Sequence, residues 1–366
     1  MRPDSILRTL RDAGFEAYYV GGCVRDKLLM RPCSDWDITT AALPEEVMAL
    51  FSHTVPTGLK HGTVTVLLDG ERAEVTTFRA DGVYLDSRHP EDVRFVRSLR
   101  EDLSRRDFTI NAMALGLDGT ITDLFGGQED LRRGIIRCVG EPETRFREDS
   151  LRMLRACRFA AQLGFAIEKD TWHAMEVCAP LCRKLSRERV SEETRKVLLS
   201  ERPEMLEKML ALGLLSACGA EKSTDLCWLC TLPETEAARW TGLKILLPEL
   251  DLRQFRLSGK LTALCESAAE CYLPERTEIE WKALIADRGW ETAGLIADLC
   301  GSDAVRKIEA GGDCVRLEQL AVSGRDFPGL TGKAVGQVLQ TLLRHVLEHP
   351  EDNDREKLLR LSEQLK

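Results

Sequence analysis

The stretch GGCVRDKLLMRPCSDWD, residues 21–37, decides the fold of the N-terminal part of the chain. The run Tyr18–Val20 before it has the character of a short buried strand, and Gly21 and Gly22 end that strand ahead of a helical run. Two adjacent glycines leave backbone N–H groups accessible, so a phosphate could approach them closely. The sequence therefore predicts a strand, a phosphate-binding turn and a helix in direct succession.

Asp35 and Asp37 close this stretch and are two residues apart. If residues 35–40 form a strand, both carboxylates point to one face of it and Trp36 to the other. Carboxylates placed in this way can bridge two Mg²⁺ ions, as phosphoryl and nucleotidyl transfer require. A lone Asp-x-Asp is more often a solvated turn, but its position after Gly-Gly and Arg25 favours metal binding.

The order Gly21-Gly22, Val24-Arg25-Asp26 and Asp35-x-Asp37 resembles the signature of the nucleotidyltransferase superfamily. The branch that it resembles contains the class II tRNA CCA-adding enzymes and the bacterial poly(A) polymerases. The resemblance implies an α/β N-terminal nucleotidyltransferase head with a small mixed sheet, followed by all-α neck, body and tail domains. It also implies Mg²⁺ (two ions) as cofactor, CTP and ATP as substrates, and tRNA as the macromolecular partner.

Composition limits the class of protein. A chain of 366 residues suggests roughly two to four domains, and 43% hydrophobic with 30% charged residues is ordinary for a soluble globular protein. No apolar run approaches the roughly 20 residues of a membrane span, and residues 1–10 lack a signal-peptide pattern. The 13 cysteines lack framework spacing. We therefore expect reduced thiols, a cytoplasmic location, no membrane association, and a monomer or a homodimer.

The charge is unevenly distributed along the chain. The net charge of −9 argues against a protein that coats nucleic acid non-specifically. Residues 131–200 nevertheless hold 15 Lys and Arg against 10 Asp and Glu. Such local basicity suits a phosphate-rich partner held in one place, although a helix face with ordinary ion pairs would give the same counts.

The resemblance covers nearly the whole chain and suggests a division into four parts. These are a catalytic head (1–140), a neck that recognises the base (141–202), a helical body (203–312) and a tRNA-binding tail (313–366).

In the head, Asp69-Gly70 indicates a hairpin, and Glu74 lies on its return strand at residues 73–78. Glu74 is a candidate third catalytic carboxylate beside Asp35 and Asp37, although a solvated strand position explains it equally well. The polar run 81–95 has the composition of a loop. In CCA-adding enzymes a flexible loop at this place is thought to help switch the site from CTP to ATP, so its presence favours full CCA addition.

The run Arg105-Arg106-Asp107 follows at the distance of the family's second motif, whose residues bind the triphosphate and the ribose 2′-hydroxyl. By this resemblance Arg106 holds phosphate oxygens in a bidentate manner, while Asp107 or Asn111 accepts a hydrogen bond from the 2′-hydroxyl. Gly21, Gly22 and Arg25 are the further residues expected to cradle the triphosphate.

The run Asp123-Leu124-Phe125-Gly126-Gly127 resembles the family's third motif, a hinge between head and neck. A plain Gly-Gly loop is an equal alternative.

In the neck, Asp149, Arg152 and Arg155 recur at three-residue steps in a helical pattern, so we expect them to share one helix face. Cytosine and adenine each present an amino donor beside a ring-nitrogen acceptor, whereas uracil and guanine present a carbonyl beside an N–H. A fixed carboxylate and a fixed guanidinium complement the first pair and reject the second. Asp149 and Arg152 match the family's fourth motif, which has this role; an intrahelical salt bridge is the plainer interpretation.

Other positions complete the expected site. Arg155 and Arg158 would continue the basic face toward the triphosphate or the primer end. The run 185–199 resembles the fifth motif, which braces the neck helix, and we assign it structure rather than chemistry. In the tail, Lys333 follows a glycine at a helix start and is the expected RNA-binding contact.

The sequence thus predicts template-independent addition of CCA to the 3′ end of tRNA from CTP and ATP by two-metal nucleotidyl transfer. The nearest alternatives are a poly(A) polymerase and a partial enzyme that adds only C or only A. A nucleotidyltransferase acting on a small molecule and a non-catalytic tRNA-binding protein are more distant alternatives.

Overall fold

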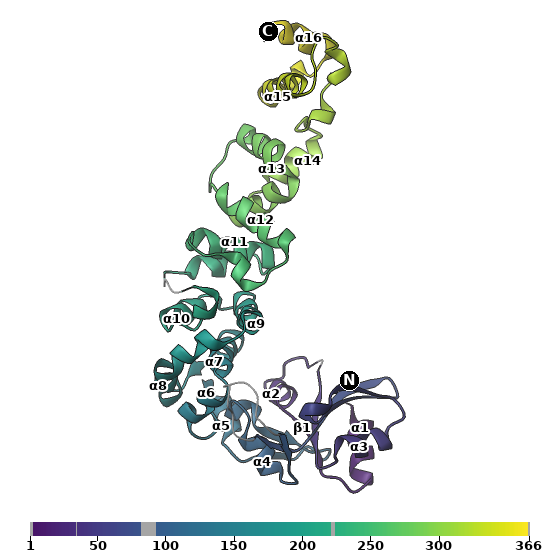
Figure 1. Ribbon diagram of the computed structural model, residues 1–366, viewed down its shortest axis with the longest axis vertical. Helices are drawn as coiled ribbons and strands as arrows, with labels where there is room; N and C mark the ends of the chain where they lie inside the picture. The colour runs from purple at the N-terminus through teal and green to yellow at the C-terminus, as the bar shows by residue number, and fades with distance from the viewer. Residues whose placement is uncertain (1–2, 34, 82–92, 221–223, 365–366) are drawn as a thin grey trace. The chain divides into compact units, whose positions relative to one another are not determined.

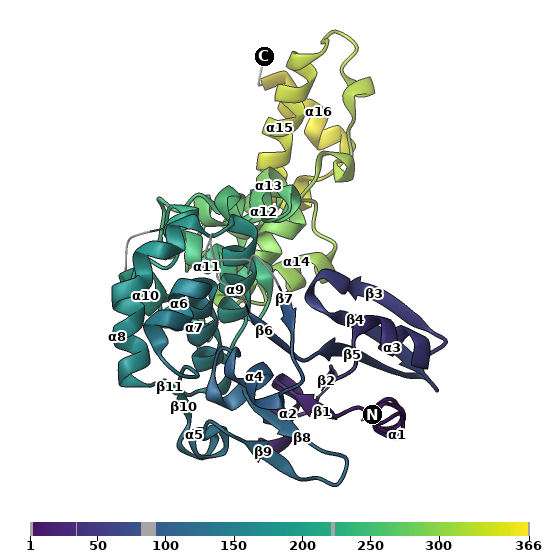
Figure 2. The same cartoon turned by 60° about the horizontal axis from the view of Figure 1, so that its bottom comes forward.

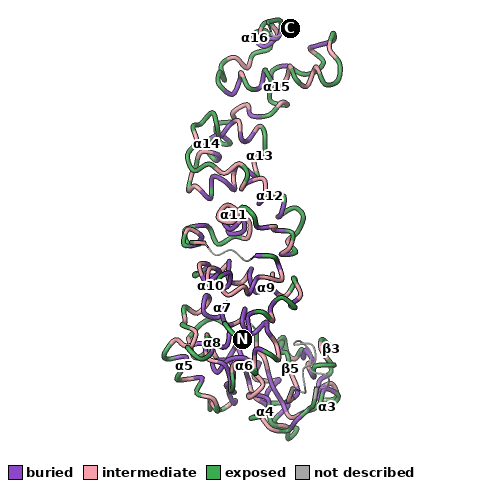
Figure 3. The backbone as a smooth tube through the Cα atoms, turned by 60° about the vertical axis from the view of Figure 1, so that its left-hand side comes forward, coloured by how far each residue is buried: buried purple, intermediate pink, exposed green. Residues whose placement is uncertain are grey.

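The computed structural model describes residues 3–33, 35–81, 93–220 and 224–364 (Figure 1). The chain forms two compact units, Met1–Ser223 and Thr224–Lys366. Buried stretches occur in both of them (Figure 3). Within the described ranges, no helix combines the length and the apolar character that a membrane crossing needs.

Within the described residues of the first unit, a seven-stranded mixed sheet forms the head (Figure 2). Its strands, in the order in which they lie side by side, are β3 (Thr54–Gly58), β4 (Thr63–Leu68), β5 (Glu71–Thr77), β2 (Asp37–Thr40), β1 (Ala17–Val20), β8 (Met113–Leu115) and β9 (Ile121–Asp123). β2 and β5 run parallel to each other, and the other neighbouring pairs are antiparallel. This arrangement confirms the predicted mixed-sheet head.

The two faces of the sheet differ because side chains alternate along each strand. In β5, Ala73 and Val75 are buried, whereas Arg72 and Glu74 on the other face are exposed. Helices α1 (Asp4–Asp12) and α3 (Pro44–Leu50) contact the apolar face. On the opposite face, α4 (Leu99–Ser104) packs through Leu103 against β1, which leaves the exposed part of β5 uncovered.

The predicted hairpin is present between β4 and β5. Asp69 and Gly70 both have positive φ, at 51° and 78°. Positive φ at both central residues is typical of the type I′ turn, whose backbone twist matches that of the flanking strands. Strand β3, which we did not predict, precedes it and contains Pro56, and it lies at the edge of the sheet, where a missing N–H is tolerated.

The expected excursion at residues 81–95 lies mostly outside the described residues. Its ends form the antiparallel pair β6 (Arg79–Asp81) and β7 (Val93–Phe95).

The run from Asp123 to Gly127 has a clear structural role. The Asp123 carboxylate accepts hydrogen bonds from the backbone N–H groups of Gly127 and Gln128, both at 2.9 Å, and so caps the helix that begins there, α5 (Gly127–Arg133). Gly126 has φ of 77°. These contacts account for the Asp-x-x-Gly-Gly pattern as a capped turn, and a hinge function stays a prediction.

The remainder of the chain is mainly helical, as predicted. The further helices of the first unit are α2 (Gly22–Leu28), α6 (Pro142–Glu148), α7 (Leu151–Leu163), α8 (Lys169–Cys178), α9 (Arg187–Leu198) and α10 (Met205–Ala211). The short strands β10 (Ile135–Ile136) and β11 (Ala166–Ile167) pair in parallel there. The second unit contains α11 (Glu236–Leu246), α12 (Gly259–Glu270), α13 (Glu278–Cys300), α14 (Ala304–Gly311), α15 (Lys333–Glu348) and α16 (Arg355–Gln364).

Replacing Gly127 by Ala tests the tight packing at the start of α5. A Cβ at this position would lie 2.3 Å from the Thr109 carbonyl oxygen, so the backbone would have to move. We expect a loss of about 1–3 kcal/mol in the free energy of unfolding of the first unit, measured by calorimetry. The control is Gly294→Ala in α13, where a Cβ would meet no atom within 4 Å. This variant should have a free energy of unfolding about 0.5–1 kcal/mol higher than the wild type, because alanine favours a helix over glycine. Equal stability of the two variants would contradict this account.

Candidate active site

Three carboxylates lie on the open face of the head sheet. Asp37 is the first residue of β2, and Glu74 of β5 lies directly beside it in the parallel register. Asp35 comes two residues earlier and is exposed. The strand begins at Asp37 and not at Asp35 as expected. Trp36 between them contacts Tyr19, whose side chain is on the opposite face and bonds to Asp4 of α1. Trp36 therefore lies on the face opposite to Asp37, as the expected alternation requires.

The pKa of Asp37 shows that these groups influence one another. Burial raises its pKa to about 6, Arg106 opposes the rise, and Glu74 and Asp35 add to it. Carboxylates that repel one another in a partly desolvated site are the hard oxygen ligands that Mg²⁺ prefers. The chemistry of these donors therefore fits a divalent cation, and the assignment of Asp37 and Asp35 as its ligands, with Glu74 as the third carboxylate, stays a prediction.

The turn between β1 and α2 converges on the same place. Gly21 has φ of 75° and ψ of −137°, a conformation that essentially only glycine adopts. A Cβ on Gly21 would lie 3.2 Å from Arg106 Nη1 and 3.6 Å from Asp37 Oδ2, so a side chain here would crowd both groups. At Gly22 a Cβ would lie 3.6 Å from Arg25 Nη2. The structure thus brings the predicted phosphate-binding glycines and arginines beside the carboxylates.

A continuous chain of hydrogen bonds joins Arg25, Asn111, Asp107 and Arg155. Arg25 Nη1 donates to Asn111 Oδ1 at 2.9 Å, and Asn111 Nδ2 donates to Asp107 Oδ1 at 3.2 Å. Arg155 Nε of α7 donates to Asp107 Oδ2 at 2.8 Å. Burial of Asp107 opposes its ionisation, but Arg155, with Asn111 and the Phe108 N–H, lowers its pKa to about 2. Both candidates for the 2′-hydroxyl contact are thus already engaged within the protein.

The predicted base-reading pair has other partners in this structure. Arg152 donates to Glu148 Oε2 at 2.6 Å and to the Arg105 carbonyl at 3.1 Å. Asp149 Oδ2 accepts from Arg189 Nη2 of α9 at 2.8 Å. The expectation that one helix carries both residues was wrong, because α6 ends before Asp149 and α7 begins after it, with Asp149 in an extended conformation (φ −144°, ψ 103°).

The remaining predicted residues are placed as follows. Arg158 is buried, pairs with Glu193 of α9 at 3.3 Å, and stacks on Phe159 with 4.3 Å between its Cζ and the ring centroid. It therefore braces α7 against α9, as the resemblance implied for the 185–199 run. Lys333 is exposed as the first residue of α15 in the second unit.

Two residues that the sequence analysis did not single out take part in the site. Asp102 of α4 is fully buried and pairs with Arg105 at 2.8 Å and Arg106 at 3.2 Å. The spacing of i, i+3 and i+4 from Asp102 could have revealed this cluster. Arg189 reaches Asp149 from 40 residues along the chain, a distance at which no local pattern indicates contact.

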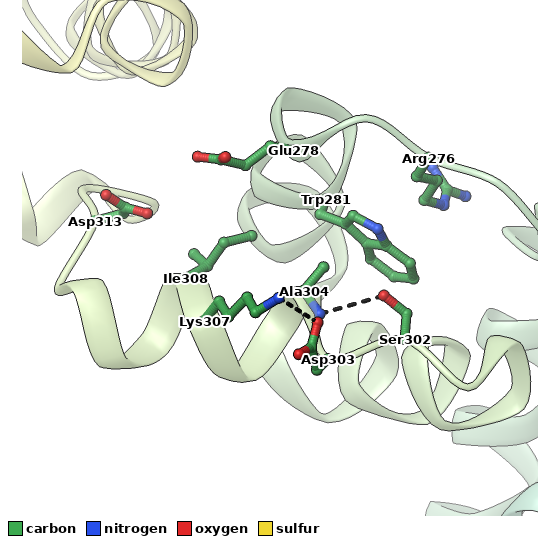
Figure 4. A pocket seen from close by; sticks show the side chains of 9 residues that line it. All are labelled: Arg276, Glu278, Trp281, Ser302, Asp303, Ala304, Lys307, Ile308 and Asp313. Atoms are coloured by element: carbon green, nitrogen blue, oxygen red, sulfur yellow. Dashed lines mark hydrogen bonds and ion pairs between the residues drawn. The ribbon is translucent and has the colours of Figure 1, made fainter.

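A separate cavity of about 330 Å³ lies in the second unit (Figure 4). Trp281 and Ile308 line it, and the charged Lys307 beside it pairs with Asp303 at 2.9 Å. None of the site residues expected from the sequence lines this cavity.

The strand–Gly-Gly–helix turn and the three carboxylates on an open sheet face define a nucleotidyltransferase head. A family model described as "Poly A polymerase head domain" matches residues 17–137, and one described as "Probable RNA and SrmB- binding site of polymerase A" matches residues 164–218. The CCA-adding enzyme of Enterococcus faecalis is 40% identical over 97% of this chain and 93% of its own length. The CCA-adding enzyme of Geobacillus stearothermophilus is also 40% identical, over 96% of this chain and 94% of its own length. The chain belongs to the family of CCA-adding enzymes, which are tRNA nucleotidyltransferases.

Solved structures agree with this assignment. A crystal structure of the Bacillus stearothermophilus CCA-adding enzyme in complex with CTP is 35% identical and has a TM-score of 0.79, covering 100% of this chain and 98% of that chain. A Thermotoga maritima CCA-adding enzyme complexed with tRNA is 18% identical with a TM-score of 0.65, covering 100% and 97%, and shares the fold.

The buried Asp107–Arg155 pair predicts a pH-dependent loss of stability on replacement. Because the pKa of Asp107 is about 2 when folded and about 4 when unfolded, its ionisation stabilises the fold above pH 4, and this stabilisation is lost as the pH falls toward 2. Asp107→Asn should cost at least about 2 kcal/mol at pH 7 and at pH 5, and less at pH 3. Urea unfolding followed by circular dichroism measures the difference. A cost that does not change between pH 7 and pH 3 would contradict the assignment.

Proposed function

We propose that this chain adds CCA to the 3′ end of tRNA from CTP and ATP without a nucleic-acid template. The observation that carries the proposal is the placement of Asp37 beside Glu74 on an open sheet face, next to Arg106 and the Gly21 turn. A nucleotidyl transfer site needs acidic ligands where the reacting phosphate lies and positive charge where pyrophosphate leaves. The geometry provides both within one small region of the head.

The residues would divide the work as follows. Asp37 and Asp35 would hold the metal ions, with Glu74 as the candidate third carboxylate. Two bound Mg²⁺ ions supply activation of the attacking 3′-hydroxyl and neutralisation of the leaving pyrophosphate. The backbone N–H groups at Gly21 and Gly22 would bind the triphosphate. Arg25 and Arg106 are the proposed cationic contacts to the triphosphate, and Arg155 and Arg158 would continue the basic face toward the triphosphate or the primer end.

We further propose that Asp149 and Arg152 read the base. Asp149 would accept from the amino group that cytosine and adenine share, and Arg152 would donate to the neighbouring ring nitrogen. Arg189 and Glu148 now bond to these two side chains at 2.8 and 2.6 Å. Such partners hold the side chains in one orientation, which lowers the entropy cost of binding a base.

Three coarser expectations extend this proposal to the rest of the chain. Lys333 at the start of a 16-residue helix would contact a tRNA phosphate. The thirteen cysteines all lie within the described residues as thiols and not as disulfides, which supports the reducing cytoplasm as the location. The four-part division at residues 140, 202 and 312 stays a prediction, alongside the two compact units.

An extension assay tests the proposed function. Purified protein, Mg²⁺ and a tRNA transcript without its CCA end are mixed with CTP, ATP, both, UTP or GTP, and the products are sized at single-nucleotide resolution. We expect two additions with CTP and a third only when ATP is also present. Asp37→Ala should lower the rate by about a thousandfold, because a metal site supplies several kcal/mol of transition-state stabilisation, while tRNA binding in a filter assay stays near wild type.

Other products would lead to other conclusions. A long ladder with ATP alone would indicate a poly(A) polymerase, and a stop after CC would indicate a partial enzyme. An Asp37→Ala protein that extends at the wild-type rate would refute the metal assignment.

Selectivity among the four nucleotides tests the base-reading residues. In the double variant Asp149→Ala, Arg152→Ala, discrimination of CTP against UTP should fall by about a hundredfold, because the groups that reject the wrong edge are gone. The control is Arg145→Ala, since Arg145 also pairs with Glu148, at 2.7 Å, but is not proposed to meet the base. Unchanged discrimination in the double variant, measured as a ratio of kcat/KM values, would refute the model.

A further inference from the structure

Asp102 is a fully buried carboxylate within α4, on the face of the sheet that carries the site. Its Oδ2 accepts from the Thr39 hydroxyl and from Arg106 Nη2, both at 3.2 Å. Thr39 belongs to β2, two residues after Asp37, and is itself fully buried. A single oxygen therefore ties Arg106 to the strand that presents the catalytic carboxylates.

The other oxygen of Asp102 holds a second arginine and a piece of backbone. Oδ1 accepts from Arg105 Nη2 at 2.8 Å and Nε at 3.1 Å, and from the backbone N–H of Arg79 at 3.4 Å. Arg105 Nε also donates to the Arg79 carbonyl at 3.1 Å. Burial opposes ionisation of Asp102, yet Arg106 and Arg105 hold its pKa below the ordinary value. The carboxylate is thus charged and saturated with donors.

The consequence for Arg106 is a guanidinium with one end fixed and the other directed into the site. Nη2 bonds to Asp102, while Nη1 lies 3.2 Å from where a Cβ on Gly21 would be. The Arg106 side chain is only 18% exposed. Its Nε makes no hydrogen bond with the described residues, so Asp102 is the anchor that the structure shows for this group.

We propose that Asp102 is the positioning residue for Arg106, acting through that arginine on the triphosphate and not on the base. The inference rests on the proposed function, since it needs a triphosphate at the Gly21 turn. Arginine has a large rotamer entropy, and a fixed guanidinium loses little of it when it binds a phosphate. Without Asp102 this entropy is lost at the moment of binding, and Arg106 is free to pair with Asp37 instead.

Asp102→Asn is the variant that separates these roles. An amide nitrogen at the Oδ2 position can still donate to the Thr39 hydroxyl, whereas one at the Oδ1 position would face three N–H donors from Arg105 and Arg79. We therefore expect the amide nitrogen on the Oδ2 side, where Arg106 loses its acceptor. The matched control is Asp130→Asn. Asp130 is also buried and also bridges a threonine hydroxyl (Thr109, 2.7 Å) and an arginine (Arg137 Nε, 3.1 Å), but it takes no part in the site.

The measurement is equilibrium binding of CTP, CDP and CMP to the full-length protein without tRNA, in the presence of Mg²⁺. We expect Asp102→Asn to weaken CTP binding by about ten- to thirtyfold and CMP binding by less than about threefold. Asp130→Asn should bind all three as the wild type does. If Asp102 had a purely structural role, Asp102→Asn would weaken the binding of all three nucleotides equally, and that result would overturn the proposal.

A double-mutant cycle shows whether Asp102 acts through Arg106. In an Arg106→Gln background, Asp102→Asn should not weaken CTP binding further, because the group that it positions is gone. Additive losses would overturn the proposal. If circular dichroism shows that Asp102→Asn does not fold, Thr39→Val takes its place in the cycle, because it removes one donor from Asp102 and keeps the charge. Thr39→Val should weaken binding of CTP more than binding of CMP, again only when Arg106 is present.

The wild-type protein separates this inference from the function on which it rests. If wild-type protein neither binds CTP nor extends tRNA, the proposed function fails and the inference fails with it. If the wild type does both and Asp102→Asn retains wild-type CTP binding, only the inference is overturned.

Discussion

The parallel pairing of β2 with β5 is the constraint on which the site depends. In this register Asp37 lies beside Glu74, and alternation along both strands directs these side chains away from the face that α1 and α3 cover. A slip of one residue would turn Asp37 toward the apolar face and Ile38 toward solvent, which burial of Ile38 forbids. Packing of the hydrophobic core thus determines the positions of Asp37 and Glu74, and the raised pKa of Asp37 follows from its position.

Local patterns in the sequence were sufficient for the parts of the head that local chemistry determines. The Gly21 turn and the Asp69-Gly70 hairpin were predicted because each needs backbone conformations that few residues adopt. The break between helices at Asp149 was not predicted, because helical spacing continues through Asp149 in the sequence. Its pairing with Arg189 was not predicted either, because the arginine comes from another helix. The resemblance to a known family supplied the rest of the expected site, since composition and charge alone left an ordinary basic helix equally acceptable.

Each arginine of the expected site has a carboxylate partner within the protein. The pairs are Arg25–Asp26, Arg106–Asp102, Arg155–Asp107, Arg158–Glu193 and Arg152–Glu148. Several guanidinium groups packed around a few side chains would repel one another strongly in a partly buried region, and these carboxylates offset that repulsion. Arg152, Arg155 and Arg158 belong to the basic segment 131–200, so this part of its positive charge is not freely available. In the proposed function a triphosphate would meet guanidinium groups that carboxylates already orient, so recognition would depend more on geometry than on net charge.

Side chains of α2 and α7 connect the proposed triphosphate site with the proposed base-reading residues. Arg25 of α2 stacks on Phe159 of α7, with 5.1 Å from its Cζ to the ring centroid, and Arg155 of α7 lies at 5.4 Å from the same ring. Arg155 in turn bonds to Asp107, which follows α4. One packed layer therefore connects the turn proposed for the phosphates with the helix that follows the proposed base-reading residues. Since packed side chains resist small displacements, the two proposed binding regions keep a fixed separation, and a nucleotide bound at one of them would be positioned for the other.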